Sequence, residues 1–259
     1  MTRPTALVTG ASSGIGMEFA KLAAGDGHNL ILVARSTEKL EQLGAQLARE
    51  HGVESLALTI DLAQPDGASR LGRLLEEHNA TVDVLINNAG FADRGTVAEI
   101  GEARQIDMIQ VNITALTALT CHLLPAMLAR RRGAILNVAS TAAFQPGPEM
   151  SVYYATKAFV LHFTEGLHEE LLGTGVSVTC LCPGATATGF AAEAGVEQTL
   201  LFRLGTANAR DVAVAGWAGL KRNKAIVIPG LKNKLSAFGS RLAPRSLVRK
   251  LAHSLQRGT

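Results

Sequence analysis

Cysteine is scarce in this chain. Only three occur among 259 residues, and Cys121, Cys180 and Cys182 are irregularly spaced. Three thiols cannot build a disulfide framework or a four-ligand zinc site, and none of the seven histidines has a metal-like spacing to another histidine or to a cysteine. We therefore expect free thiols, a reducing compartment and no bound metal.

Long apolar runs are also missing. The chain shows no long apolar stretch ahead of a small-residue cleavage site near its start, and no uninterrupted apolar run of spanning length. It also lacks fixed-period repeats, low-complexity blocks and Pro/Gly/Ser linkers. With 47% hydrophobic and 18% charged residues, the composition is typical of a globular protein. We predict a single domain over residues 1–259, cytoplasmic and without a transmembrane segment.

Acidic residues are absent from the C-terminal part. Asp211 is the last of them, whereas ten Lys and Arg follow between Lys221 and Arg257. Residues 1–211 hold the other fifteen cations and all twenty-two acidic residues, a net charge of −7. The basic extension, about residues 230–259, could attract a phosphorylated ligand, an acidic carrier protein or an anionic membrane, although solvated helix faces give the same pattern. Aromatic residues do not interleave with the basic ones, so we expect no nucleic-acid partner.

The chain does contain a regular alternation of strand-like and helix-like segments. Seven short runs rich in Val, Ile and Leu are separated by segments of helical periodicity; the runs are ALVTG, NLILVA, SLALTI, VDVLIN, GAILNVAS, VSVTCL and AIVIPG. This alternation predicts an α/β fold, a doubly wound (Rossmann) seven-stranded parallel sheet with helices on both faces. Ligands of such sheets bind beyond the carboxyl ends of the strands, so functional residues are expected just after each strand.

The first strand leads directly into a glycine turn, TGASSGIG, and then into a helical pattern. Glycine permits positive φ, lets backbone N–H groups approach a diphosphate and allows close contact between helix and strand. The helix N-terminus also favours an anion. These features predict a dinucleotide site that includes Gly10, Ser12, Ser13, Gly14, Ile15 and Gly16.

A carboxylate is missing where the second strand ends. NAD-binding units usually place one there for the adenosine ribose, and an arginine nearby can accept a 2′-phosphate instead. Here Arg35 and Ser36 occupy that place. A guanidinium makes charge-assisted hydrogen bonds to phosphate, and Ser12, Ser36 or Lys39 can assist it. We therefore predict NADP(H), rather than NAD(H), as the cofactor.

Tyr153 and Lys157 lie four residues apart at the start of a strongly helical segment, so both project from one helix face. An ammonium beside a phenol stabilises phenolate and is expected to lower the phenol pKa toward neutrality. Ser140 follows the strand that ends near Ala139, where its hydroxyl can hydrogen-bond a substrate carbonyl oxygen. The three residues predict proton transfer at a carbonyl oxygen.

Together these motifs resemble the short-chain dehydrogenase/reductase family over nearly the whole chain. The matching features, in family order, are TGASSGIG, Asp61, the Asn-Asn-Ala-Gly segment at 87–90, Asn112, Ser140, Tyr-x-x-x-Lys at 153–157 and Pro183-Gly184. The resemblance implies that Tyr153 exchanges a proton with the substrate oxygen and that Ser140 positions this oxygen. It further implies that Lys157 also binds the nicotinamide ribose and that Asn112 holds a water leading to solvent.

The resemblance implies further cofactor contacts and an oligomer. The residues implied near adenine, ribose and the nicotinamide carboxamide are, in that order, Asp61 and Leu62; Asn88, Ala89 and Gly90; and Pro183, Gly184, Thr186 and Thr188. Thr186 departs from the Ile or Val of many relatives. Relatives often pair the helices matching residues 116–127 and 159–171 between subunits, which implies a homodimer or homotetramer.

The substrate region implied by the resemblance runs from Ala185 to about Arg210. Its apolar residues predict a lid over the nicotinamide; they are Phe190, Val196, Leu200, Leu201, Phe202 and Leu204. We predict NADPH-dependent reduction of an apolar ketone or aldehyde to an alcohol. Two alternatives stay open: a 3-oxoacyl-thioester (ketoacyl) or hydroxysteroid-type reductase with the same mechanism, and a catalytically idle NADP(H)-sensing protein.

Overall fold

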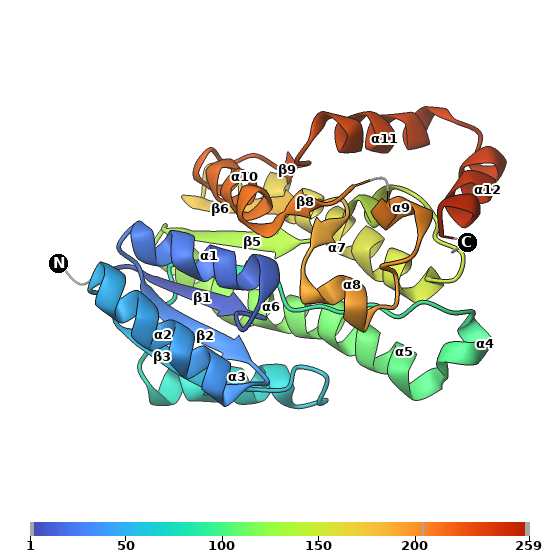
Figure 1. Ribbon diagram of the computed structural model, residues 1–259. Coiled ribbons are helices and arrows are strands. Elements are labelled where there is room, and N and C mark those ends of the chain that lie inside the picture. The colour runs from blue at the N-terminus through green and yellow to red at the C-terminus, as the bar shows by residue number, and fades with distance from the viewer. Residues whose placement is uncertain (1–2, 204, 257–259) are drawn as a thin grey trace.

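Seven parallel strands form the central sheet of the computed structural model, which describes residues 3–203 and 205–256 (Figure 1). Their spatial order is β3-β2-β1-β4-β5-β6-β9, and each neighbouring pair is parallel. The strands are β1 Thr5–Thr9, β2 Asn29–Ala34, β3 Ser55–Thr59, β4 Val84–Asn87, β5 Gly133–Val138, β6 Val176–Leu181 and β9 Ile226–Val227. Each run predicted from the sequence supplies one strand, which confirms the predicted sheet.

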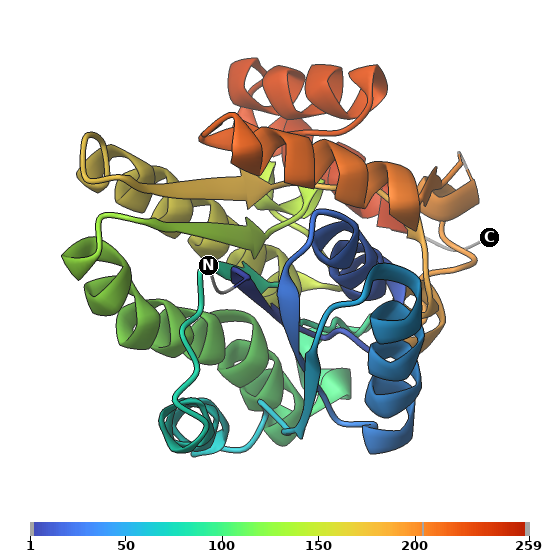
Figure 2. The same ribbon diagram turned by 90° about the vertical axis from the view of Figure 1, so that its left-hand side faces the viewer.

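Helices cover both faces of the sheet. One face carries α1 Gly14–Gly25, α2 Thr37–His51 and α10 Ala209–Lys221; the other carries α3 Gly67–Glu77, α6 Leu116–Ala129 and α7 Ser151–Glu170. Figure 2 shows α1 and α2 on one side of the strands and the green helices α5 and α6 on the other. The doubly wound class predicted from the sequence is confirmed.

β1 illustrates why these segments are strands of a covered sheet. Leu7 belongs to the apolar cluster under α3 and α6, whereas Ala6 and Val8 belong to the cluster under α1 and α2, and all three are fully buried. Successive side chains of a strand point to opposite faces, so a strand covered on both sides must be apolar at every position. This requirement produces the unbroken apolar runs of the sequence.

The order of the strands changes direction at β1. From β1 the chain passes to β2 and β3 on one side, and then returns to β4, β5 and β6 on the other. The loops that follow β1 and β4 therefore lead away from each other at the carboxyl edge of the sheet. A crevice opens at such a switch point, and ligands of open α/β sheets bind there.

Shorter elements surround this edge. They are α4 Val97–Ile100, α5 Glu102–Ile109, the π-helical turn η1 Gln110–Ala115, the 3-10 turn η2 Thr141–Phe144, β7 Thr186–Ala187, α8 Gly189–Glu193, α9 Leu200–Arg203 and β8 Ala207–Asn208. β7 and β8 pair with each other outside the main sheet. The sequence did not predict this pair, because two residues are too few to produce a recognisable strand pattern.

α5, η1 and α6 form one continuous helical stretch, Glu102–Ala129, that is long and apolar enough to cross a membrane, with a mean hydropathy of 1.5. Length and composition are weak evidence for a span, because a core helix meets the same test. Leu119, Leu123 and Met127 are buried in the cluster beneath the sheet. We therefore describe this stretch as a core helix of the fold.

The basic extension contains two helices, α11 Leu231–Leu242 and α12 Arg245–Gln256. In both views α11 lies outside α10, away from the centre of the sheet (Figures 1 and 2). α12 packs against α9, and its Val248 and Ala252 are buried. Arg257 and the two residues after it lie outside the described part of the chain.

Candidate active site

A cleft of about 800 Å³ opens at the carboxyl edge of the sheet, where the loops after β1 and β4 lead away from each other. Every cofactor contact predicted from the sequence lines this cleft except Gly16, and Ser140 lines it as well. Asn112 lies behind the lining. The structure thus brings the predicted residues together, while the role of each remains a prediction.

The glycine turn after β1 shapes one wall of the cleft. Gly10 has a φ of 66°, a conformation that residues with a side chain rarely adopt. A Cβ on Gly16 would lie 2.3 Å from the Gly10 carbonyl oxygen, so α1 can approach the strand only with glycine there. Ser13, the N-cap of α1, makes no side-chain hydrogen bond to the first turn. The amide groups of that turn therefore remain available for an anion, and the wall fits a diphosphate.

Hydrogen bonds fasten this turn to the one after β4. The Thr9 hydroxyl accepts from the backbone N–H groups of Asn88 and Ala89, both at 3.0 Å. The Asn88 amide in turn donates to the Thr9 carbonyl oxygen at 2.9 Å. The sequence analysis did not assign Thr9 a role, although its position directly before the glycine turn was the available clue.

The end of β2 places Arg35, Ser36 and Lys39 on the cleft. Arg35 Nη2 lies 3.5 Å from Glu193 Oε1 of α8, and both side chains are exposed. Exposed pairs of this kind contribute about 0–1 kcal/mol, so the guanidinium can readily exchange its partner for a phosphate. After the neighbouring strand β3, Asp61 accepts a hydrogen bond from the backbone N–H of Ala63 at 3.0 Å.

Ser140, Tyr153 and Lys157 meet beneath the middle of the cleft. The Ser140 hydroxyl interacts with the Tyr153 phenol; its Oγ accepts from the Ala142 N–H at 3.1 Å and donates to the Pro183 carbonyl oxygen at 3.5 Å. Lys157 Nζ donates to the Val138 carbonyl oxygen at 2.9 Å and lies 5.8 Å from the centre of the Tyr153 ring. Both Tyr153 and Lys157 are buried. The arrangement places the Tyr153 phenol, the Ser140 hydroxyl and the Lys157 ammonium in one space that contains little water.

Burial changes the pKa of both groups. It raises the pKa of Tyr153 well above the ordinary value, and the hydrogen bond from Ser140 opposes this only in part. The net shift of the Tyr153 pKa is therefore opposite to the lowering predicted from the sequence, because loss of hydration outweighs the favourable contacts. Burial also lowers the pKa of Lys157 to about 8.

Asn112 lies in the π-helical turn between α5 and α6 and is buried. Its side chain accepts from the Phe91 N–H at 3.1 Å and donates to the Phe91 carbonyl oxygen at 3.0 Å and to the Thr156 hydroxyl at 3.1 Å. These three hydrogen bonds join the loop after β4 to α7. The water-holding role implied for Asn112 stays a prediction.

The region after Pro183 folds over the cleft only in part as predicted. Phe190, Val196 and Phe202 line the cleft, and the Phe190 ring centre lies 5.8 Å from that of Tyr153. Leu200 instead is 40% exposed and does not line it. Leu204 and the side chain of Leu201 lie outside the described part of the structure. An apolar pattern predicts a lid, but it does not specify which side chains turn inward.

The C-terminal helices also line the cleft, which the sequence analysis did not foresee. Asn233 and Ser236 of α11 and Leu255 of α12 contribute to the lining. The apolar spacing of Leu247, Leu251 and Leu255 predicted an amphipathic helix. Of these three leucines only Leu255 lines the cleft, whereas Leu247 and Leu251 are exposed.

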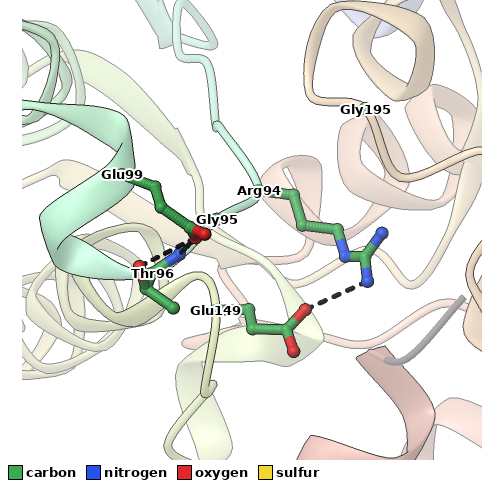
Figure 3. A pocket seen from close by; sticks show the side chains of 6 residues that line it. All are labelled: Arg94, Gly95, Thr96, Glu99, Glu149 and Gly195. Atoms are coloured by element: carbon green, nitrogen blue, oxygen red, sulfur yellow. Dashed lines mark hydrogen bonds and ion pairs between the residues drawn. The ribbon is translucent and has the colours of Figure 1, made fainter.

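A smaller hollow of about 390 Å³ lies beside the lid (Figure 3). Arg94 points toward Glu149, with Nη2 at 3.0 Å from the carboxylate, while Gly195 of the lid faces them. His253 of α12 approaches the other oxygen of the same carboxylate at 3.4 Å. Glu149 thereby connects the loop after β4 and the C-terminal helix at the rim of the cleft.

Comparisons with known proteins agree with this geometry. A sequence profile described as short chain dehydrogenase matches residues 4–199. The ketoacyl reductase HetN of Nostoc sp. is 33% identical over 229 residues, which cover 88% of this chain and 79% of that protein. A short-chain dehydrogenase from Sphingobium yanoikuyae, solved in complex with NADPH, is 36% identical with a TM-score of 0.82, covering 95% of this chain and 97% of its own.

A second solved structure with a similar fold is the bulky-bulky ketone specific alcohol dehydrogenase from Comamonas testosteroni. It is 30% identical with a TM-score of 0.78, and 93% of this chain and 94% of that one are covered. The sequence profile ends at residue 199, before α10. The structural similarities therefore extend over parts of the chain that the profile does not cover.

The lowered pKa of Lys157 predicts a stability that rises with pH. The folded chain releases this proton at about pH 8, whereas the unfolded chain holds it to the ordinary value of 10.5. Between these values the unfolded state binds more protons, so the free energy of unfolding increases with pH. From about pH 7 to about pH 10, the wild type should gain roughly 2 kcal/mol relative to Lys157→Met, as measured by urea unfolding. A difference that stays constant over this range would contradict the lowered pKa.

Proposed function

Because the chain belongs to the short-chain dehydrogenase family, we propose that this oxidoreductase reduces the carbonyl group of an apolar ketone or aldehyde, with Ser140, Tyr153 and Lys157 as its catalytic residues. The observation on which the proposal rests is their position. The Tyr153 phenol, the Ser140 hydroxyl and the buried Lys157 line the same cleft as the nucleotide-binding wall and the apolar lid. A reacting carbonyl oxygen placed there would meet two hydroxyl groups at once.

The cofactor is NADP(H). A similar short-chain dehydrogenase was solved with NADPH, and here the end of β2 presents Arg35 where NAD-binding units usually present a carboxylate. Gly10 to Ile15 would hold the diphosphate, and Arg35 with Ser36 the 2′-phosphate. Asn88 to Gly90 and Lys157 would hold the nicotinamide ribose. NADPH supplies the hydride for the carbonyl carbon.

Side chains of this protein supply the proton that the carbonyl oxygen needs. Ser140 Oγ hydrogen-bonds the carbonyl oxygen and holds it against the phenol. Tyr153 then donates its proton to that oxygen as negative charge develops there, which completes the alcohol. Lys157, still largely ammonium at neutral pH with a pKa of about 8, stabilises the resulting phenolate. Because burial raises the pKa of Tyr153, the residue begins this step as a protonated phenol.

The lining of the substrate side favours an apolar carbonyl compound. Phe190, Phe202 and Val196 of the lid line the cleft together with Leu255 of α12, and the Phe190 ring centre lies 5.8 Å from that of Tyr153. The relatives include a dehydrogenase named for bulky ketones and a ketoacyl reductase. A 3-oxoacyl thioester is therefore the second candidate substrate, and the reaction on it would be the same. An idle NADP(H)-sensing role is disfavoured, since Ser140, Tyr153 and Lys157 are all present.

The free cysteines bear on the compartment of the protein, and the exposed apolar side chains of α6 and α7 bear on its oligomeric state. The three cysteines are free thiols, which suits a reducing compartment, and we propose the cytoplasm. We also propose a homodimer or homotetramer that pairs α6 and α7 of neighbouring subunits. Leu128 and Phe159 on these helices are 37% and 39% exposed, and would be covered there.

The first test is a substrate panel. NADPH oxidation, followed by absorbance, should be fastest with bulky apolar ketones or aldehydes and slow with sugars, because Phe190, Val196 and Phe202 of the lid present apolar surface to the substrate. Turnover of 3-oxoacyl thioesters well above that of every simple ketone would identify the ketoacyl reaction instead. Tight NADPH binding without turnover of any compound would contradict the enzyme assignment and favour the sensor.

Tyr153→Phe should retain NADPH binding and lose most turnover. The substitution removes only the hydroxyl that donates the proton, and general acid catalysis contributes about 10²–10⁴-fold. Measurements of kcat and of NADPH affinity by fluorescence titration separate the two effects. Tyr154→Phe removes the neighbouring hydroxyl and serves as the matched variant, with kcat expected within about tenfold of the wild type. Near-normal turnover of Tyr153→Phe would exclude it as the proton donor.

Arg35→Asp should reverse the nucleotide preference. It replaces a cation for the 2′-phosphate with a carboxylate for the ribose hydroxyls, and hydrogen bonds to charged groups contribute about 1.5–3 kcal/mol. The ratio of kcat/KM for NADPH to that for NADH should therefore fall by at least about tenfold. Arg70→Asp, the same change at an exposed position of α3, should leave the ratio unchanged. An unaltered preference for NADPH over NADH in Arg35→Asp would contradict the assignment of Arg35 to the 2′-phosphate.

A further inference from the structure

The outward face of α11 is apolar. Leu231, Leu235, Phe238 and Leu242 are 72%, 63%, 62% and 71% exposed. At 3.6 residues per turn these side chains fall within an arc of about 60°. Ala237, on the other side of the helix, is buried against the domain. α11 thus presents its large apolar side chains to the surroundings, the reverse of an ordinary amphipathic surface helix. We refer to these four side chains as the α11 face.

Cations border the α11 face on both sides. By the same helical geometry Lys232 lies on one side of the apolar arc, and Lys234 and Arg241 lie on the other. All three are exposed. The neighbouring α12 adds three more exposed cations, Arg245, Arg249 and Lys250, and two exposed leucines, Leu247 and Leu251.

These six cations form no ion pairs within the described part of the chain, residues 3–203 and 205–256. The sequence explains this in part, because no acidic residue follows Asp211. The surface around α11 is therefore positive as well as apolar, and its natural complement is an anionic surface that also accepts apolar side chains.

We propose that α11 docks on an anionic lipid bilayer, with the α11 face inserted at the headgroup boundary and the bordering cations against lipid phosphates. Helices that bind in the plane of the membrane interface combine Leu and Phe on one face with Lys and Arg on the rest. Each cation held near an anionic membrane surface strengthens binding about fivefold. Insertion of the apolar side chains and attraction of the cations therefore act together.

Protein partners fit this surface less well. A second copy of the chain would bring two sets of unneutralised cations together, and like charges oppose that contact. An acidic protein would neutralise the cations, but it would need a groove to receive the apolar side chains. α11 protrudes from the domain (Figures 1 and 2), and a bilayer accepts a protruding helix without any groove.

The inner side of the same helix faces the active site. Asn233 and Ser236 line the cleft, while the α11 face points away from the domain. Docking would therefore bring the rim of the cleft close to the bilayer, where apolar compounds accumulate. The proposal for α11 stands whichever carbonyl compound is reduced, because it concerns binding to lipid and not turnover.

Vesicle flotation of the full-length protein tests the apolar part of the contact. The wild type should bind vesicles of equal parts phosphatidylcholine and phosphatidylserine, and should bind pure phosphatidylcholine far more weakly. Leu235→Ser should weaken binding to the anionic vesicles about tenfold, because burial of a leucine side chain is lost. Leu172→Ser is the matched control, since Leu172 is 56% exposed just after α7, and it should bind like the wild type. Unchanged NADPH-dependent turnover without vesicles shows that both variants are folded.

The charged part has its own pair of variants. Lys232→Gln with Lys234→Gln should weaken binding about 25-fold, whereas Arg70→Gln with Arg73→Gln, on the exposed side of α3, should have no effect. Absence of wild-type binding to anionic vesicles, or unweakened binding of Leu235→Ser, would overturn the proposal. If the wild type does not bind vesicles, two further measurements identify the occupant of the α11 face instead. A smaller oligomer of Leu235→Ser in sedimentation equilibrium would indicate a second copy of the chain. Binding of an acyl carrier protein through the same residues would indicate an acidic protein partner.

Discussion

The hydrogen bonds between the turns after β1 and β4 hold the site together. Thr9 accepts from two backbone N–H groups of the β4 turn, and Asn88 donates back to the Thr9 carbonyl oxygen. These turns follow the two strands at which the sheet changes direction, and the hydrogen bonds extend the pairing of β1 with β4 beyond the ends of the strands. The width of the cleft between the nucleotide-binding wall and the catalytic residues depends on this link.

A second polar connection extends from the sheet to the catalytic helix. Asn87 donates to Asn137 at 2.9 Å, and Asn137 donates to Thr164 of α7 at 3.0 Å. All three side chains are buried, where hydrogen bonds are strong because water does not compete for them. Lys157 Nζ adds a bond from α7 to the end of β5. α7 is thus fixed to β4 and β5 by directional contacts, and Tyr153 is fixed with it.

Much of this could be predicted from the sequence. A sheet covered on both faces leaves unbroken apolar runs, as at Leu7 and its neighbours, so the strands and their class were predictable. The glycine turn was predictable because close approach of α1 leaves no room for a Cβ at Gly16. Both are local consequences of backbone geometry.

What could not be predicted depends on contacts between distant segments. The direction of the Tyr153 pKa shift depends on burial, which a spacing of four residues does not reveal. Leu200 faces outward while Phe202 faces the cleft, and only the packed lid decides between them. The same holds for Leu255, whose apolar spacing predicted a helix but not the surface it would cover.

The two ends of the described chain meet in one cleft, since Gly10 and Leu255 both line it. During translation Gly10 is synthesised long before Leu255. The sheet from β1 to β6 and the catalytic residues emerge before α11 and α12. During synthesis the nascent protein therefore passes through a stage in which Ser140, Tyr153 and Lys157 can already be in place while the cleft still lacks part of its wall. The site is complete only after α11 and α12 have emerged and packed against it.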